Sequence, residues 1–157
     1  MEKEAATVRA EADGLVAAAE ALRADRELLE TIPGVGRRTA TTVLAERPAV
    51  ERLPGAGSAA AACGLAPRES RSGTSVKRRT RLSKAGNARL RQALYLPTLT
   101  AIRFHPVLKG FYDRLVAAGE PRMQAAGACR RRLVMLCYGV LKNRAPFDPD
   151  WASKKAA

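Results

Sequence analysis

The sequence feature that most constrains this chain is a block of positive charge over residues 68–91, RESRSGTSVKRRTRLSKAGNARLR. The block holds nine Lys or Arg residues and one Glu in 24 positions, and its only large apolar residues are Val76, Leu82 and Leu90. A segment of this charge density cannot enter a hydrophobic core, so it is either a solvated segment or a surface that meets a polyanion. Because helical patterns flank the block on both sides, we expect a polyanion-facing surface inside a folded protein.

The composition favours an all-α fold, mainly helical. The chain has 157 residues, enough for one domain, and its apolar content of 46% includes only 4% aromatic residues. Such a core must be built from Leu, Val and Ala, which favours helices. The formal net charge of +13 points to nucleic acid before an anionic membrane.

The location and the redox state follow from what the sequence lacks. No apolar run approaches the ~20 residues that a membrane span needs, and the acidic, Ala-rich N-terminus has no signal-peptide pattern. We therefore expect a cytoplasmic protein that does not contact membranes. Cys63, Cys129 and Cys137 form no C-x-x-C pair, so we expect reduced, buried thiols and no metal site.

Residues 1–30 are predicted to form one coiled-coil-like helix. Its apolar seam steps by four and three and is interrupted once by a charged residue; the seam positions are Val8, Ala12, Leu15, Ala19, Leu22, Arg26 and Leu29. Two interpretations stay open, since the seam can pack on its own domain or pair with the same helix of a second copy. The narrow seam slightly favours pairing, which predicts a homo-oligomer.

Residues 28–47 resemble a helix-hairpin-helix motif, which binds the DNA backbone without reading bases. A turn made of Pro33 and Gly34-Val35-Gly36 precedes an apolar helical pattern, and Arg37 and Arg38 follow the turn directly. Glycines allow a sharp turn that exposes N–H groups at a helix N-terminus, a geometry that suits a phosphate oxygen. A purely structural corner between two helices is the alternative.

The remaining pattern predicts a short Ala-rich helix capped by Ser58, and three further helices. One helix should begin after an N-cap at Ser83 and run over 85–104, with Pro97 kinking or dividing it. Its core-facing residues should be Leu90, Leu94, Leu96, Leu99 and Ile102.

The last two helices should run from Pro106 to Gly119 and from Pro121 to Asn143. His105, the only histidine, is interpreted as a cap or core residue. Within the basic block a loop or a small β-hairpin is possible.

The order of these pieces resembles the C-terminal transposase domain of the insertion-sequence 110/116/902 family. IPGVGRRTA is followed by CGLAPRESRSG, RLSKAGNARLRQALY, a Tyr-bearing amphipathic helix, a late Arg cluster and PFDP, over roughly residues 28–151. We therefore expect three parts: the coiled-coil-like helix at 1–30, a transposase C-terminal domain at 31–151 that includes the hairpin unit at 28–47, and a frayed tail at 152–157.

The resemblance also implies a DNA transposase or recombinase that cleaves and rejoins strands through a serine nucleophile. By position in the RSG turn this serine is Ser72, with Ser70 and Ser75 as competing choices. The residues expected to contact DNA are Gly34, Val35, Gly36, Arg37, Arg38, Arg68, Arg71, Gly73, Lys77, Arg78, Arg79, Arg81, Lys84, Asn87 and Arg91.

The resemblance further implies an N-terminal RuvC-like domain, which members of this family usually carry and whose four acidic residues hold Mg²⁺; some members are guided by a structured RNA. None of the five Asp residues of this chain has a strand-like setting that would build such a cluster. We therefore expect no cofactor in this chain and Mg²⁺ only with a RuvC-like domain. The alternative function is a DNA- or RNA-binding module without catalysis, as in a truncated transposase remnant.

Overall fold

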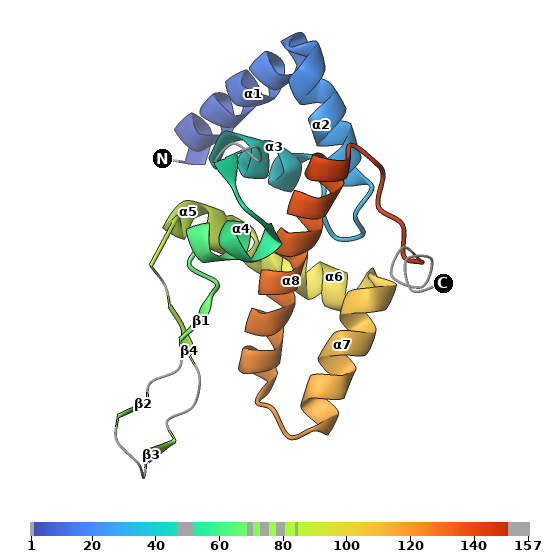
Figure 1. Ribbon diagram of the computed structural model, residues 1–157. Coiled ribbons are helices and arrows are strands. Elements are labelled where there is room, and N and C mark those ends of the chain that lie inside the picture. The colour runs from blue at the N-terminus through green and yellow to red at the C-terminus, as the bar shows by residue number, and fades with distance from the viewer. Residues whose placement is uncertain are drawn as a thin grey trace.

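The structure is a computed structural model that describes residues 2–46, 52–68, 71–72, 76–77, 81–83 and 85–150. Its helices are α1 (Glu2–Ala18), α2 (Glu20–Glu30), α3 (Arg37–Glu46), α4 (Ala56–Ala62), α5 (Ala88–Ala93), α6 (Tyr95–Phe104), α7 (Pro106–Ala117) and α8 (Arg122–Asn143). Its strands are β1 (Pro67–Arg68), β2 (Arg71–Ser72), β3 (Val76–Lys77) and β4 (Arg81–Leu82). The mainly helical fold predicted from the composition is confirmed (Figure 1).

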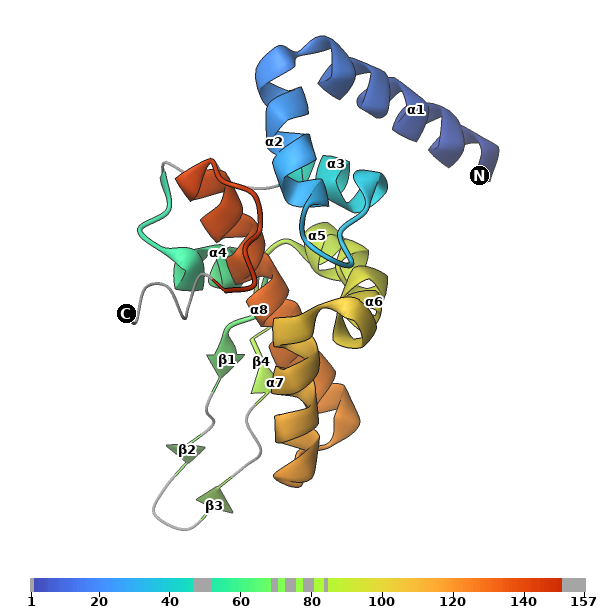
Figure 2. The same ribbon diagram turned by 90° about the vertical axis from the view of Figure 1, so that its right-hand side faces the viewer.

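Helix α8 is the centre of the core. It runs through the middle of the molecule in both ribbon views, and α2, α4, α6 and α7 pack against it (Figures 1 and 2). Its buried residues recur on several sides of the helix, from Ala125 near its start to Leu141 near its end. No helix in the described part of the chain is both long enough and apolar enough to span a membrane.

The prediction of one continuous helix over residues 1–30 is wrong. Ala19 has an extended backbone (φ −93°, ψ 106°) and separates α1 from α2, which point in different directions (Figure 2). The apolar seam is divided with them: Leu29 is fully buried in α2, whereas Val8 and Leu15 of α1 are 64% and 73% exposed. Packing of α2 on α3 and α8 fixes its direction, and α1 bends away to contact α3, where Thr41 donates to Asp13 at 2.9 Å.

The prediction of one helix from an N-cap at Ser83 is also wrong in part. The cap is Asn87, whose side-chain oxygen accepts the Leu90 N–H at 3.1 Å, and α5 ends before Leu94. Pro97 divides the segment as expected: it lies in the first turn of α6, where a missing N–H leaves no helical bond unmade. The break rotates the second helix, so that Leu96 is 69% and Leu99 38% exposed instead of facing the core.

Helix α7 begins as the sequence predicts, with Pro106 in its first turn and His105 as both cap and core residue. The His105 Nδ1 accepts the Leu108 N–H at 3.3 Å, and its ring lies 4.5 Å from the Phe147 ring. The side chain is 0% exposed. Burial lowers the pKa of His105 below its usual value, because a charged imidazolium would lose its hydration.

The short helix α4 differs from the prediction at its N-terminus. It begins after Gly55, so Ser58 lies inside the first turn and does not cap the helix. The predicted end is close to the observed one, since Gly64 follows the last residues with φ +67°. Gly64 thereby adopts the left-handed conformation that commonly ends helices.

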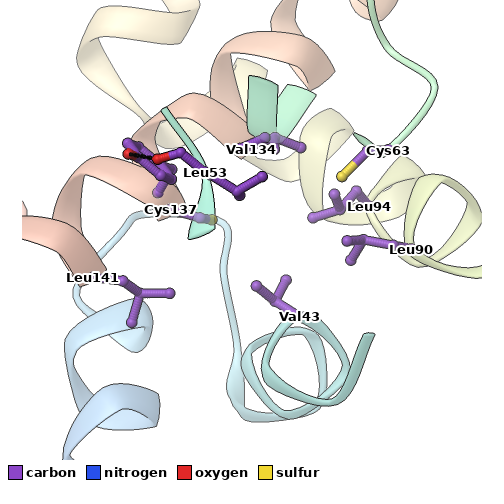
Figure 3. A pocket seen from close by; sticks show the side chains of 10 residues that line it. Val43, Leu53, Cys63, Leu90, Leu94, Val134, Cys137 and Leu141 are labelled. Atoms are coloured by element: carbon purple, nitrogen blue, oxygen red, sulfur yellow. Dashed lines mark hydrogen bonds between the residues drawn. The ribbon is translucent and has the colours of Figure 1, made fainter. Parts of the chain in front are cut away.

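The three cysteines are free and buried, as predicted. Cys63 and Cys137 line an apolar cavity of about 30 Å³ between α3, α4, α5 and α8, where the Tyr138 hydroxyl donates to the Leu53 carbonyl at 3.1 Å (Figure 3). Burial raises the pKa of the Cys63 thiol to about 11 and that of Cys137 to about 12. Both therefore stay protonated at neutral pH, and the cavity is a packing space of roughly one water's size.

Candidate nucleic-acid interface

Part of the basic block forms a two-stranded arm, made of β1 to β4, that projects from the helical body (Figure 1). At its base β1 pairs with β4 in antiparallel register, and further out β2 pairs with β3. In both ribbon views β2 and β3 lie at the opposite end of the molecule from α1 (Figures 1 and 2). Ser72 is the last residue of β2 and stands opposite Val76, so it belongs to the outer part of the arm.

The backbone register of the arm pairs two basic residues with each other twice. Arg68 is the partner of Arg81, and Arg71 is the partner of Lys77. Like charges directly opposite in an antiparallel pair are unfavourable. A polyanion along the arm would turn this unfavourable term into a favourable one, which is the arrangement expected of a phosphate-contacting element.

The base of the arm is anchored to the body. The Ser83 N–H donates to the Ala66 carbonyl at 2.9 Å, and Leu82 packs on α8 at Gly127. A Cβ at Gly127 would lie 3.3 Å from the Leu82 Cδ1 atom, so the absence of a side chain permits this close contact. The remaining predicted residues of the arm (Gly73, Arg78, Arg79 and Lys84), and the competing serines Ser70 and Ser75, lie outside the described residues.

Asn87, predicted to contact DNA, uses its side chain within the protein. Its oxygen caps α5, and its Nδ2 donates to the Glu46 carboxylate at 2.8 Å. Gly86 before it has φ +133°, and a Cβ there would lie 2.5 Å from the Ala62 carbonyl oxygen. Gly86 and Asn87 together hold the start of α5 against α3 and α4. This role of Asn87 is structural.

Arg91 and Arg130 are neighbouring cations, and each donates a hydrogen bond to a backbone carbonyl. Arg91 donates to the Cys63 carbonyl at 3.3 Å, and Arg130 donates to the Arg91 carbonyl at 3.2 Å. Burial and the positive charge of Arg91 lower the pKa of Arg130. Arg132 lies two residues after Arg130 on α8 but stacks on Phe111 instead, with its Cζ 3.9 Å from the ring centre. Arg130 and Arg132 therefore do not present one common face.

The hairpin between α2 and α3 divides into a buried half and an exposed half. Gly34 has φ +97°, and a Cβ there would lie 2.7 Å from the Ala101 Cβ, so this glycine is required by contact with α6. Val35 is 4% exposed and its N–H donates to the Ile32 carbonyl at 2.9 Å. Gly36, Arg37 and Arg38 are exposed at the start of α3, where first-turn N–H groups lack helical partners.

Sequence reasoning missed a groove beside this hairpin. It has a volume of about 470 Å³ and brings Arg9 of α1 and Gln92 of α5 to the same cavity as Arg38. The three residues are far apart in the sequence, and the bend at Ala19 that moves Arg9 to this place has no local signal such as Pro or Gly. Only the tertiary arrangement reveals them.

The described residues do not fit a Mg²⁺ site. Within the ranges that the structure describes, no three His, Cys, Asp or Glu residues gather as metal ligands. Divalent magnesium needs carboxylate oxygens placed together.

The fold and the interface define a small helical domain that carries a cationic two-stranded arm. Residues 26–113, which run from α2 into α7 and include the hairpin and the arm, match the transposase IS116/IS110/IS902 family. The match covers more than half of the chain, and the protein belongs to this family. The family resemblance inferred from the sequence is confirmed.

Two named relatives are similar over most of the chain. The pilin gene-inverting protein of Moraxella lacunata is 30% identical over 122 residues, which are 77% of this chain and 38% of the relative. The 43.6 kDa protein of insertion element IS110 from Streptomyces coelicolor is 30% identical over 121 residues, which are 77% of this chain and 30% of the relative. The chain thus spans less than two fifths of the length of these relatives.

Proposed function

We propose that this chain takes part in DNA transposition or recombination. In this proposal it is the part of a transposase that binds the phosphodiester backbone and supplies Ser72 as nucleophile. The observation that supports the proposal is the arm register, which pairs Arg68 with Arg81 at the base and pairs Arg71, the residue directly before this serine, with Lys77. Membership of a transposase family, and a relative named for gene inversion, support DNA as the partner.

The proposed reaction is a balanced transesterification. The Ser72 hydroxyl oxygen attacks phosphorus, the bond from phosphorus to the 3′ oxygen breaks, and the serine proton ends on the released 3′-hydroxyl. The product is a phosphoserine linkage, and attack by a 3′-hydroxyl on that linkage rejoins a strand without an external energy source. Arginine and lysine side chains of the arm would neutralise charge on the transferring phosphoryl group.

Activation of Ser72 needs groups from outside the described helical body. A serine hydroxyl is a weak nucleophile unless a base or another group activates it. The lone histidine is buried beside Phe147 in a different part of the fold, so it cannot serve this role. A RuvC-like domain with bound Mg²⁺ is the proposed source, and a structured guide RNA is a further proposed partner.

Ser72 lies in the outer part of the arm, and this position equally favours a second function, which is binding of nucleic acid without cleavage. The two functions are separated by incubating the protein with labelled DNA and Mg²⁺ and searching for an adduct that survives denaturation. The first function predicts an adduct that Ser72→Ala abolishes and Ser70→Ala keeps. Equal binding by all three proteins with no adduct from any of them would leave the binding function alone.

Salt dependence tests whether the arm contacts phosphates at all. The arm carries seven Lys or Arg residues between positions 68 and 84. If each neutralised one phosphate of a DNA duplex, the logarithm of the affinity would fall with the logarithm of salt concentration with a slope of about −6. An affinity that hardly changes with salt would contradict the proposal.

A homo-oligomer formed through α1 is also proposed. Val8 and Leu15 lie seven residues apart on one helix and remain 64% and 73% exposed. Residues with this spacing fall on one face and suit pairing with the same helix of a second copy.

A further inference from the structure

The groove noted beside the hairpin is built from three separate parts of the chain. Arg9 reaches it from α1, Arg38 and Thr39 from the first turn of α3, and Gln92 and Thr100 from α5 and α6. Helix α1 forms one wall because the chain bends at Ala19 and because Thr41 of α3 bonds to Asp13 of α1. The bend that ended the predicted continuous helix therefore creates this cavity.

The chemistry of the lining selects an anionic ligand. Guanidinium groups come from two different elements, and hydroxyl and amide groups add further donors. Among the described residues that line the groove, none is Asp or Glu. First-turn N–H groups of α3 add positive potential close to Arg38, since no helical carbonyl accepts from them.

The size and the apolar part of the lining favour more than a free phosphate. A volume of about 470 Å³ lies within the roughly 300–1,000 Å³ of sites that hold drug-sized ligands. Leu96, which is 69% exposed, and Pro97 supply apolar surface suited to sugar rings between phosphates. The same surface offers little to a small inorganic anion.

We propose that this groove holds the sugar–phosphate backbone of a nucleic-acid strand, with Arg9 and Arg38 contacting its phosphates. The groove adjoins α1, whereas the outer strands of the arm lie at the opposite end of the molecule (Figure 2). The protein therefore contacts nucleic acid at two separate places. This inference rests on the proposed nucleic-acid function and adds a second binding surface to it.

The test measures fluorescence anisotropy with two probes, a labelled DNA duplex and a labelled RNA hairpin. Arg9→Gln removes one exposed cation and should weaken binding about tenfold, as expected for one charged hydrogen-bonded contact. It should also make the salt slope less steep by about 0.9 for duplex DNA. Arg103→Gln is the matched control. Arg103 is exposed on α6 and does not line the groove, and its replacement removes the same charge as Arg9→Gln.

A second variant blocks the groove without changing its charge. Thr100 is exposed on α6 and lines the groove, so Thr100→Trp should fill it and weaken binding as Arg9→Gln does. Circular dichroism checks that this variant folds. A loss with only one probe identifies DNA or RNA as the strand held there, and an equal loss with both indicates their common backbone.

Two failures are distinguishable. If Arg9→Gln and Thr100→Trp bind like Arg103→Gln while Lys77→Gln in the arm weakens binding, the groove proposal is overturned and the proposed function stands. If the unmodified protein binds neither probe at low salt, both proposals are overturned.

Discussion

Replacing Asn87 should destabilise the fold without removing a DNA contact. The side chain makes three hydrogen bonds: its oxygen accepts from the Leu90 N–H at 3.1 Å, and its Nδ2 donates to the Glu46 carboxylate at 2.8 Å and to the Glu46 backbone carbonyl at 3.3 Å. Losing the cap costs about 1 kcal/mol. Losing a bond to a carboxylate costs about 1.5–3 kcal/mol, and the lower end applies because the Glu46 side chain is 27% exposed.

Asn87→Ala should therefore lower the free energy of unfolding by about 2–3 kcal/mol. For a domain of this size that corresponds to a fall of about 5–10 °C in Tm. Urea unfolding followed by circular dichroism measures the free energy, and a thermal scan measures the Tm. Asn87→Ser, which keeps a capping hydroxyl but cannot reach Glu46, should recover roughly the 1 kcal/mol of the cap.

A double-mutant cycle isolates the bond between the Asn87 amide and the Glu46 carboxylate. Combining Asn87→Ala with Glu46→Ala should show a coupling energy of about 1–2 kcal/mol, because the residues are in direct contact. Arg89→Ala is the matched control on the same carboxylate: its side chain is 85% exposed and its nitrogen lies 3.7 Å from Glu46, so its loss should cost less than about 0.5 kcal/mol.

DNA affinity decides between the structural and the DNA-contacting role. Measured at a temperature where both proteins are folded, Asn87→Ala should bind DNA like the unmodified protein. An unchanged Tm together with a loss of affinity comparable to that of Lys77→Gln would refute the structural assignment.

Three further predictions concern the hairpin, the buried histidine and α1. Gly34→Ala should lower the free energy of unfolding in urea by at least about 2 kcal/mol, because its Cβ would lie 2.7 Å from the Ala101 Cβ at φ +97°. A Cβ at Gly36 would have no atom within 4 Å, so Gly36→Ala should lower it by less than about 1 kcal/mol. Equal losses for the two variants would contradict this account. Because burial lowers the pKa of His105 below 6.5, the unfolded chain binds the proton more tightly, so the free energy of unfolding should fall as pH drops below about 6.5. His105→Asn should flatten that dependence, and an unchanged slope would rule out this histidine as its source. Leu15→Glu should convert an oligomer into a monomer in sedimentation analysis, and a monomeric unmodified protein would end the pairing proposal.

Several elements could be predicted because their signals are local. Pro106, Gly119 and Pro121 mark helix ends through backbone geometry alone: α7 begins and ends, and α8 begins, where these residues indicate. The charged block is expected at the surface because its charge cannot be buried. The family follows from short motifs whose order is visible in the chain.

Other elements could not be predicted because competing local signals were equally good. Ser83 and Asn87 are both acceptable caps, and contact with Glu46 decides for Asn87. Gly34 suits either a phosphate-facing turn or a tight helix contact, and the position of Ala101 shows that the contact requires it. The direction of α1 depends on how α2 packs on α8, which no nearby residue encodes.

The sequence by itself determined the helical class and the family, and it predicts a basic surface suited to a polyanion, because composition, turn residues and charge act locally. Only the tertiary structure decided which basic residues are paired across strands and which line the same groove. It placed Arg68 opposite Arg81 on the arm, and it brought Arg9 and Arg38 to one groove. These arrangements depend on strand register and on the angle between α1 and α2, and both are set by packing between segments that are distant in the chain.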